Sequence, residues 1–360
     1  MSGKNNFYIT TQPELDRVVD LISERKLVAL DTEFTRETTY YPILSIIQIA
    51  VKNSSNVKES FIVDCLCDLD LTRFFALVAD KEIIKILHSP AQDLQIFYRQ
   101  SGLLPRNIFD TQILANFCGL GFNIGYSNLV HSLFKKELNK NQQRSDWQRR
   151  PLSSGQVKYA LLDVFFLEEI YEKLLTDLKK KNRFEWYLEE MKTFSEKVIQ
   201  DSEENLLKKF SFRRKNPQQV SQIKNLIFWR EQWARNLNIP RQHFIRDEQI
   251  ENLVEKDLSE VRLGKRINKK MITEISEILA QKDELILENI SLDSVQKKML
   301  EKAKEMIAKI SVEKNFREQF LVTNSDLKKI ICEKNSLKKI ITGWRYEMFG
   351  NELEQLLLDQ

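Results

Sequence analysis

The chain contains few cysteines and no long apolar segment. Its four cysteines include no CxxC pair, and none has a histidine at zinc-site spacing, so we expect reduced thiols in a reducing compartment. The N-terminus lacks an apolar signal segment. The longest apolar stretch, residues 40–51, is too short to cross a bilayer and contains Ser45 and Gln48. These absences predict a cytoplasmic protein with no membrane partner.

A phosphate-binding loop is also missing. No GxxxxGK[ST] motif occurs in the sequence, which argues against a helicase and predicts no nucleotide cofactor. Basic residues outnumber acidic ones by 56 to 52, and residues 1–200 carry 26 of each. The excess therefore lies entirely behind residue 200, as in a tail that helps to hold a polyanion.

The first 200 residues alternate between strand-like and helix-like patterns. Thr11 and Glu14 have the spacing of a capping box and begin a helix predicted over residues 8–26. Short apolar runs predict strands at residues 27–31, 43–51, 60–64 and 83–88. Amphipathic patterns predict helices at residues 71–78, 92–100, 111–117 and 156–178. This alternation indicates a layered α/β domain, which we place at residues 1–200.

The remainder of the chain reads as helical. Residues 201–215 are predicted to be a basic linker, on the basis of the stretch LLKKFSFRRKNP at residues 206–217. No convincing strand follows residue 218. Helices are expected at residues 220–237, 248–254, 269–281 and 337–359. We predict two small helical modules, at residues 216–290 and 291–360.

Four acidic residues stand out because their surroundings are apolar. Asp31 and Glu33 are two apart on a predicted strand, so their side chains share one face. Asp93 opens the helix that follows the strand at residues 83–88, and Asp163 is the only charged residue within four positions on either side. Carboxylates are costly to bury without a cation. Together the four predict a socket for divalent metal.

Each of these residues also has a plainer interpretation. Asp31 and Glu33 could point to solvent at a strand end, and Asp93 could only stabilise a helix N-terminus. Tyr159 shares a helical face with Asp163, but could pack as an ordinary core aromatic. For His88, a hydrogen-bonding role behind the metal ligands is favoured over ligation.

Taken in order as DxE, HxxxxD and YxxxD, the motifs resemble the ribonuclease D family, in the DEDDy group of 3′→5′ exonucleases. The matching segments are DTEF (31–34), HSPAQDL (88–94) and YALLD (159–163), with FDTQILANFCG (109–119) and SDWQRRPLS (145–153) between them. The resemblance continues into the tail. NLIFWREQWARNLNIPRQHFIRDEQI (225–250) is similar to an HRDC module, and TGWRYEMFGNELEQLL (342–357) to the second, HRDC-like module.

The resemblance implies a fold and a mechanism. The fold is a ribonuclease H-like α/β domain, with a mixed sheet of about five strands flanked by helices, followed by two small all-α HRDC-type domains. The mechanism is hydrolysis with two divalent ions, Mg²⁺ or Mn²⁺, for which carboxylates are suitable ligands. Asp31 would bridge both ions, Glu33 and Asp163 would complete the first site, and Asp93 would help to hold the second. Tyr159 would orient the attacking water.

The implied activity is trimming of RNA from the 3′ end, releasing 5′-nucleoside monophosphates. The implied substrates are tRNA precursors and other small structured RNAs, and we expect a monomer. A DNA exonuclease remains an alternative, because the sequence does not reveal the contacts that recognise a 2′-hydroxyl. A non-catalytic nucleic-acid-binding scaffold is a further alternative, which the complete set of four carboxylates and Tyr159 argues against.

Candidate RNA contacts lie near the first motif and in the basic tail. Basic side chains attract phosphates, and Phe210 and Phe212 interleave with them. A solvated face with its aromatics in a core is an equally good interpretation, and Trp229 and Trp233 are expected to be core residues. The candidate contacts are Thr32, Phe34, Lys208, Lys209, Arg213, Arg214, Lys265 and Arg266.

Overall fold

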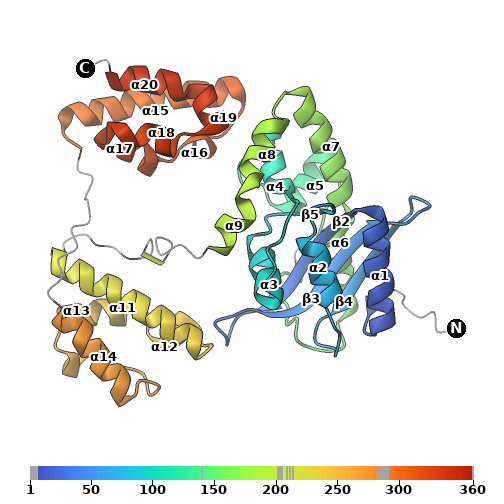
Figure 1. Ribbon diagram of the computed structural model, residues 1–360, viewed down its shortest axis with the longest axis horizontal. Coiled ribbons are helices and arrows are strands. Elements are labelled where there is room, and N and C mark those ends of the chain that lie inside the picture. Colours follow the sequence, from blue (N-terminus) through green and yellow to red (C-terminus); the bar gives the residue numbers. More distant parts are fainter. Residues whose placement is uncertain are drawn as a thin grey trace. The chain divides into compact units, whose positions relative to one another are not determined.

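The described residues of this computed structural model form two compact units (Figure 1). They are residues 7–139, 141–200, 206–207, 210, 212, 215–281 and 292–358. The first unit draws on Met1–Glu33, Leu44–Ile199 and Ile290–Gln360, and the second on Phe34–Ile43 and Gln200–Asn289. The C-terminal helices thus group with the nuclease part, whereas the sequence predicts them as a separate module.

A mixed six-stranded sheet forms the centre of the first unit, in the order β1-β4-β3-β2-β5-β6. Its strands are β1 (Tyr8–Ile9), β2 (Leu27–Thr35), β3 (Ile43–Lys52), β4 (Lys58–Asp64), β5 (Ile84–Leu87) and β6 (Ile108–Asp110). β3 and β4 pair antiparallel, while β1–β4, β2–β5 and β5–β6 are parallel. The four predicted strands are confirmed. The expected count of about five is corrected to six, because β1 and β6 are edge strands too short to give a sequence pattern.

Helices flank this sheet (Figure 1). They are α1 (Gln12–Arg25), α2 (Thr72–Ala79), α3 (Ala91–Ser101), α4 (Thr111–Cys118), α5 (Tyr126–Phe134), α6 (Ser154–Phe165), α7 (Leu167–Lys180), α8 (Phe184–Lys192) and α9 (Phe194–Ile199). The capping box of Thr11 and Glu14 is confirmed at the start of α1. The prediction that this helix begins at residue 8 is wrong, because Tyr8 and Ile9 pair with β4 instead.

Two predicted long helices are interrupted. The helix expected over residues 156–178 is divided into α6 and α7 at Phe166. The helix expected over residues 337–359 is divided near Gly343, whose φ of 53° is left-handed and whose missing Cβ leaves room for the Glu189 side chain. The C-terminal elements are α15 (Ser294–Lys314), α16 (Glu318–Leu321), α17 (Asn324–Cys332), η2 (Lys334–Ser336), α18 (Leu337–Ile340), α19 (Gly343–Arg345), η3 (Tyr346–Gly350) and α20 (Asn351–Leu358).

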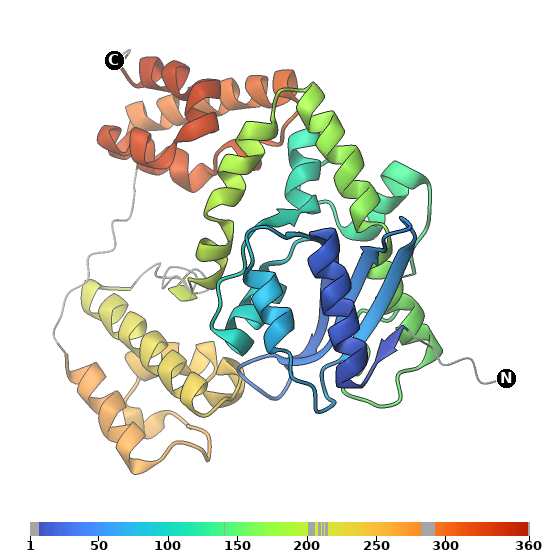
Figure 2. The same ribbon diagram turned by 45° about the vertical axis from the view of Figure 1, so that its right-hand side comes forward.

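The C-terminal helices share a core with the nuclease helices. α19 lies beside α8 (Figures 1 and 2). The buried ring of Phe117 on α4 meets Phe320 and Trp344 with centroids 5.1 Å away in each case. Arg345 adds an ion pair of 2.7 Å to Glu190 on α8. Apolar packing and paired charge therefore hold these segments in one unit.

The second unit is a helical module that includes the segment linking β2 to β3. Its helices are α11 (Pro217–Asn236), α12 (Arg241–Phe244), α13 (Asp247–Glu255), η1 (Leu258–Glu260) and α14 (Lys269–Ala280). Tyr40 is buried in this module. Its hydroxyl donates to the Glu231 carboxylate and accepts hydrogen bonds from Arg235 at 3.0 Å and Arg241 at 3.1 Å. Trp229 is buried here and Trp233 is half-buried, as expected of core residues.

Candidate active site

Strand β2 carries the first two acidic residues. Val28, Ala29 and Leu30 are fully buried, and β2 lies between β3 and β5 in the middle of the sheet. Asp31 and Glu33 follow on one face of this strand, and both are half-buried. The strand therefore fixes two carboxylates in a central position, as its sequence pattern predicts.

Helix α6 carries Tyr159 and Asp163. The helix begins with a capping box in which Ser153 accepts from the Gln156 amide at 3.2 Å. Tyr159 and Asp163 lie one turn apart, and the charge of Asp163 adds to the effect of burial in raising the pKa of Tyr159. One carboxyl oxygen of Asp163, Oδ2, is buried without a hydrogen-bond partner among the described residues. Most buried carboxyl oxygens in proteins have a partner, and a bound cation would supply one here.

The three carboxyl groups converge. Asp31, Glu33 and Asp163 each place one oxygen within 4.8 Å of the others. Burial raises the pKa of Glu33 to about 9, helped by the charges of Asp163 and Asp93. Burial also raises the pKa of Asp163 to about 8. For Asp31, burial and then repulsion from Asp93, Asp163 and Glu33 raise the pKa well above its usual value. Such repulsion is relieved when a cation binds between the oxygens, so the residues fit a divalent metal.

Asp93 lies beside this group rather than within it. The side chain is buried on α3, and burial raises its pKa to about 6. One of its oxygens accepts a hydrogen bond from the Thr32 hydroxyl. The sequence predicts four converging carboxylates, and the structure brings together three with the fourth close enough to raise the pKa of Asp31 and Glu33. Thr32 as an RNA contact stays a prediction, although its hydroxyl already has a partner.

His88 connects two segments behind the acidic group. Its Nε2 lies 3.0 Å from the Ile124 carbonyl oxygen, which can only accept, so Nε2 carries the proton. Its Nδ1 lies 2.9 Å from the Thr111 hydroxyl. Burial lowers the pKa of His88 to about 4, which keeps the ring neutral. Both ring nitrogens are therefore occupied by protein partners, which fits the hydrogen-bonding role favoured from the sequence.

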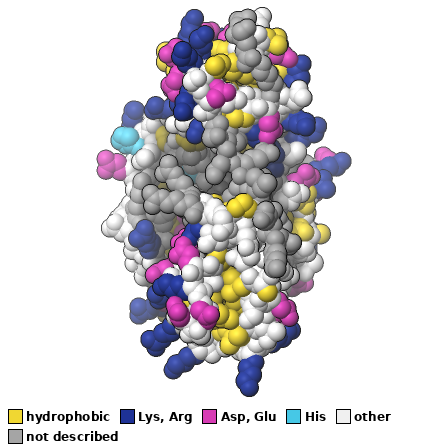
Figure 3. Space-filling model, turned by 90° about the vertical axis from the view of Figure 1, so that its left-hand side faces the viewer, with side chains coloured by type: hydrophobic (Ala, Val, Ile, Leu, Met, Phe, Trp, Pro, Cys, Tyr) yellow, Lys and Arg dark blue, Asp and Glu magenta, His cyan; other side chains and the backbone are white. Residues whose placement is uncertain are grey.

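Of the other candidate RNA contacts, Phe34 directly follows Glu33, and the rest lie beyond residue 200. Phe34 is half-buried in β2, and Lys265 and Arg266 are exposed in the turn before α14. Lys208, Lys209, Arg213 and Arg214 lie outside the described residues. Over the described part of the face seen in Figure 3, basic and acidic side chains are interspersed. All of these contacts stay predictions.

Sequence reasoning gave no role to two features near the site. Trp147 is buried, and its ring centroid lies 6.0 Å from that of Tyr159. Arg150, in the same segment, donates hydrogen bonds from Nε and Nη2 to the two carboxylate oxygens of Asp64. Tyr126 contacts the turn that contains Asp163. The SDWQRRPLS segment signalled the first feature, whereas no local pattern marks Tyr126.

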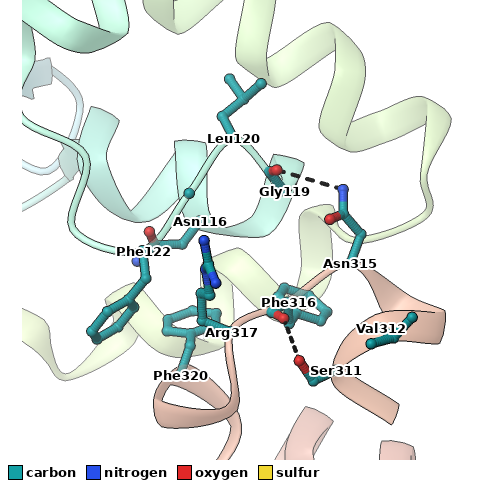
Figure 4. A pocket seen from close by; sticks show the side chains of 11 residues that line it. Asn116, Gly119, Leu120, Phe122, Ser311, Val312, Asn315, Phe316, Arg317 and Phe320 are labelled. Atoms are coloured by element: carbon teal, nitrogen blue, oxygen red, sulfur yellow. Dashed lines mark hydrogen bonds between the residues drawn. The ribbon is translucent and has the colours of Figure 1, made fainter. Parts of the chain in front are cut away.

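A separate cavity of about 420 Å³ lies where α4 meets α15 and α16 (Figure 4). Phe122, Asn315 and Arg317 are among the residues that line it, and none of the predicted catalytic residues does. The Asn315 amide donates to the Gly119 carbonyl at 3.5 Å. The loop that leads from α4 to Tyr126 thus forms one wall of the cavity.

In the part of the chain that the structure describes, no helix combines the length and apolar character needed to span a bilayer.

Known proteins resemble this chain over most of its length. A family model described as 3′-5′ exonuclease matches residues 6–179. Ribonuclease D of Bartonella henselae is 32% identical, with 99% of this chain and 92% of that protein covered. Ribonuclease D of Zymomonas mobilis is also 32% identical, over 97% and 93%. The crystal structure of Escherichia coli RNase D, an exoribonuclease involved in structured RNA processing, superposes with a TM-score of 0.82 at 25% identity over 98% of both chains. The chain belongs to the ribonuclease D family and is a hydrolytic 3′-5′ exoribonuclease.

Proposed function

We propose that this exoribonuclease trims the 3′ ends of tRNA precursors and other small structured RNAs by two-metal hydrolysis, releasing 5′-nucleoside monophosphates. Asp31, Glu33, Asp93 and Asp163 would hold two divalent ions, Mg²⁺ or Mn²⁺. The observation that carries this proposal is the convergence of three carboxyl oxygens within 4.8 Å, with a buried Asp163 oxygen lacking a protein partner among the described residues. Bound ions would activate water and neutralise charge on the leaving 3′ oxygen.

The protein side chains form the binding site, and the fold holds them in position. Asp31 and Glu33 share one face of a rigid central strand, so their oxygens are held without loop motion. Burial, followed by the charges of Asp163 and Glu33, raises the pKa of Tyr159. A phenol that stays protonated is a poor base but a good hydrogen-bond donor. We assign Tyr159 the role of orienting the attacking water.

The helical regions are the proposed RNA-holding part. We infer that residues 216–290 form an HRDC domain and residues 291–360 an HRDC-like domain, joined to the nuclease domain of residues 1–200 by the basic linker of residues 201–215. The exposed Lys265 and Arg266 support a phosphate-binding role. The relative from E. coli is described as acting in structured RNA processing, which supports the substrate class. We also infer a cytoplasmic monomer.

A labelled-substrate assay tests the activity. The full chain is incubated with 5′-labelled RNA or DNA in Mg²⁺, Mn²⁺ or EDTA. We expect single-nucleotide shortening of RNA from the 3′ end, abolished by EDTA. Internal cuts would contradict the exonuclease assignment, and faster shortening of DNA would favour the alternative substrate. Binding without shortening under every condition would indicate a scaffold.

Variants of the site separate its roles. Asp31→Asn and Asp163→Asn should each lower turnover by about a thousandfold or more, because each removes a charged ligand. Tyr159→Phe should lower turnover by about a hundredfold with little change in RNA affinity. Glu82→Gln, an exposed acid before β5, serves as the matched control and should be as active as the wild type. Full activity of Asp163→Asn, with its fold confirmed by circular dichroism, would refute the metal site.

A further inference from the structure

The junction between α6 and α7 is interrupted by a side chain from another helix. In a continuous helix the Phe166 amide would donate to the Leu162 carbonyl, four residues earlier. Instead, the Tyr126 hydroxyl donates to the Leu162 carbonyl at 2.9 Å and accepts from the Phe166 amide at 3.2 Å. The hydroxyl thus stands in for one main-chain hydrogen bond, a recognised cause of helix breaks. Asp163 lies inside this interrupted turn.

Tyr126 is itself held firmly. It is the first residue of α5, after the cap residue Gly125. The carbonyl of Ile124, two residues before Tyr126, accepts hydrogen bonds from His88 Nε2 at 3.0 Å and Gln112 Nε2 at 3.2 Å. The rings of His88 and Tyr126 have centroids 5.7 Å apart. His88, which directly follows β5, and Gln112 on α4 therefore hold the chain that leads into Tyr126.

The pKa of Tyr126 responds to the charges of the acidic group, so its hydroxyl lies near that group. Burial raises the pKa of Tyr126 well above its usual value, and the charges of Asp163 and Asp31 add to the shift. The phenol stays protonated across the working pH range, so it remains able to donate to the Leu162 carbonyl.

We propose that Tyr126 is a positioning residue for Asp163, fixing through its hydroxyl the turn from which that carboxylate reaches the metal site. This inference rests on the proposed function, because it gives Tyr126 a role only if Asp163 binds metal. Removing the hydroxyl leaves two outcomes. Either the Leu162 carbonyl and Phe166 amide close on each other and turn Asp163, or the Leu162 carbonyl loses this donor and the Phe166 amide keeps only the Val164 carbonyl. Both outcomes loosen the carboxylate.

The test variant is Tyr126→Phe, which keeps the ring and its packing. Binding of Mn²⁺ to the full chain is followed by electron paramagnetic resonance of the free ion, and RNA shortening is measured across metal concentrations. We expect Mn²⁺ affinity to fall by about tenfold, as is typical when a hydrogen bond that orients a metal ligand is lost. Turnover should fall at low metal concentration and recover in excess Mn²⁺. A purely structural role would lower the melting temperature without this metal dependence.

Two controls keep the result interpretable. Tyr171→Phe makes the same chemical change one turn into α7, where the ring packs on Phe109, and should bind Mn²⁺ like the wild type. Asp163→Asn should lose the tightest Mn²⁺ binding. If Asp163→Asn loses binding and Tyr126→Phe does not, the positioning role is wrong and the proposed function stands. If Asp163→Asn binds Mn²⁺ normally, the proposed metal site itself is wrong, and the inference is overturned with it.

Discussion

Buried carboxyl groups make the site sensitive to protons as well as to metal. The pKa of Glu33 is raised from 4.5 to about 9 and that of Asp163 from 3.8 to about 8. Between its unfolded and folded pKa values, such a group binds more protons in the folded state than in the unfolded state. Its contribution to stability is complete below the unfolded pKa and is lost as the pH rises through the folded pKa. The metal-free protein should therefore weaken towards alkaline pH.

We predict that in EDTA the melting temperature falls as the pH is raised from about 5 to about 9, and that Mg²⁺ restores most of the loss at the upper end. The physical reason is that ionised Asp31, Glu33 and Asp163 repel one another unless a cation lies between them. Scanning calorimetry with and without Mg²⁺ measures this directly. The double variant Asp31→Asn/Glu33→Gln is the control, and its pH slope should be flatter. A wild-type slope equal to that of the double variant would contradict the prediction.

For single residues, the sequence predicted which side chains share one face of a strand or a helix, because local periodicity controls that. The alternation of a strand placed Asp31 and Glu33 on one face, and the spacing of a helix aligned Tyr159 with Asp163. The hydrogen bond from Thr32 to Asp93 joins residues 61 positions apart, and the contact from Tyr126 to Leu162 joins residues 36 apart. Contacts of that range depend on how the elements pack, and no local pattern in the sequence reports them.

Among the elements, the division of the helix expected over residues 156–178 shows the same limit. Every residue in the stretch tolerates a helix, and the apolar periodicity continues through Phe166. The break arises because a hydroxyl from α5 takes the place of a main-chain hydrogen bond. Periodicity predicts which residues are helical, but tertiary contacts decide where a helix is interrupted.

The segment before α6 is a second element whose position depends on a tertiary contact. Arg150 contacts both carboxyl oxygens of Asp64, at 2.6 and 2.7 Å, and donates to the carbonyls of Ser45 and Trp147. Burial would raise the pKa of Asp64, but hydrogen bonds from Arg150 and Tyr8 lower it. This clamp fixes Trp147, whose buried ring lies beside Tyr159.

We predict that Arg150→Ala lowers the free energy of unfolding by about 3–5 kcal/mol, because it leaves the buried Asp64 carboxylate without its cation. Turnover on RNA should also fall, since the Trp147 support of Tyr159 loosens. Urea unfolding and the RNA assay measure the two effects. Arg149→Ala, its exposed neighbour, is the matched control and should change neither. An Arg150→Ala protein as stable as Arg149→Ala would show that the clamp contributes little.

In the whole molecule, each compact unit combines segments that are not consecutive in the sequence. The sequence predicts three successive modules, and their boundaries stay predictions. Segment Phe34–Ile43 includes the end of β2 and the connection to β3, and it belongs to the second unit, with Tyr40 in the core of that unit. Composition could not predict this, because a short segment joining two strands reads as a local turn. The two units are defined by hydrophobic cores that join segments distant in the sequence, and not by the positions of linkers.

The C-terminal helices give the sharpest test of this grouping. Trp344 is buried, stacks on Trp186 with centroids 5.8 Å apart, and donates from Nε1 to Glu190 at 3.1 Å. We predict that Trp344→Ala lowers the free energy of unfolding of the first unit by about 3–5 kcal/mol, because truncating a large buried ring leaves a cavity.

The decisive measurement follows the nuclease sheet and the C-terminal helices separately during unfolding, by hydrogen exchange of their backbone amides. If the two share one core, Trp344→Ala should speed exchange in both β5 and α15. Val312→Ala, at a position 84% exposed on α15, is the control and should leave both unchanged. If Trp344→Ala speeds exchange only in α15 and its neighbours, the C-terminal helices are an independent module and the nuclease domain does not need them to hold its active-site strand.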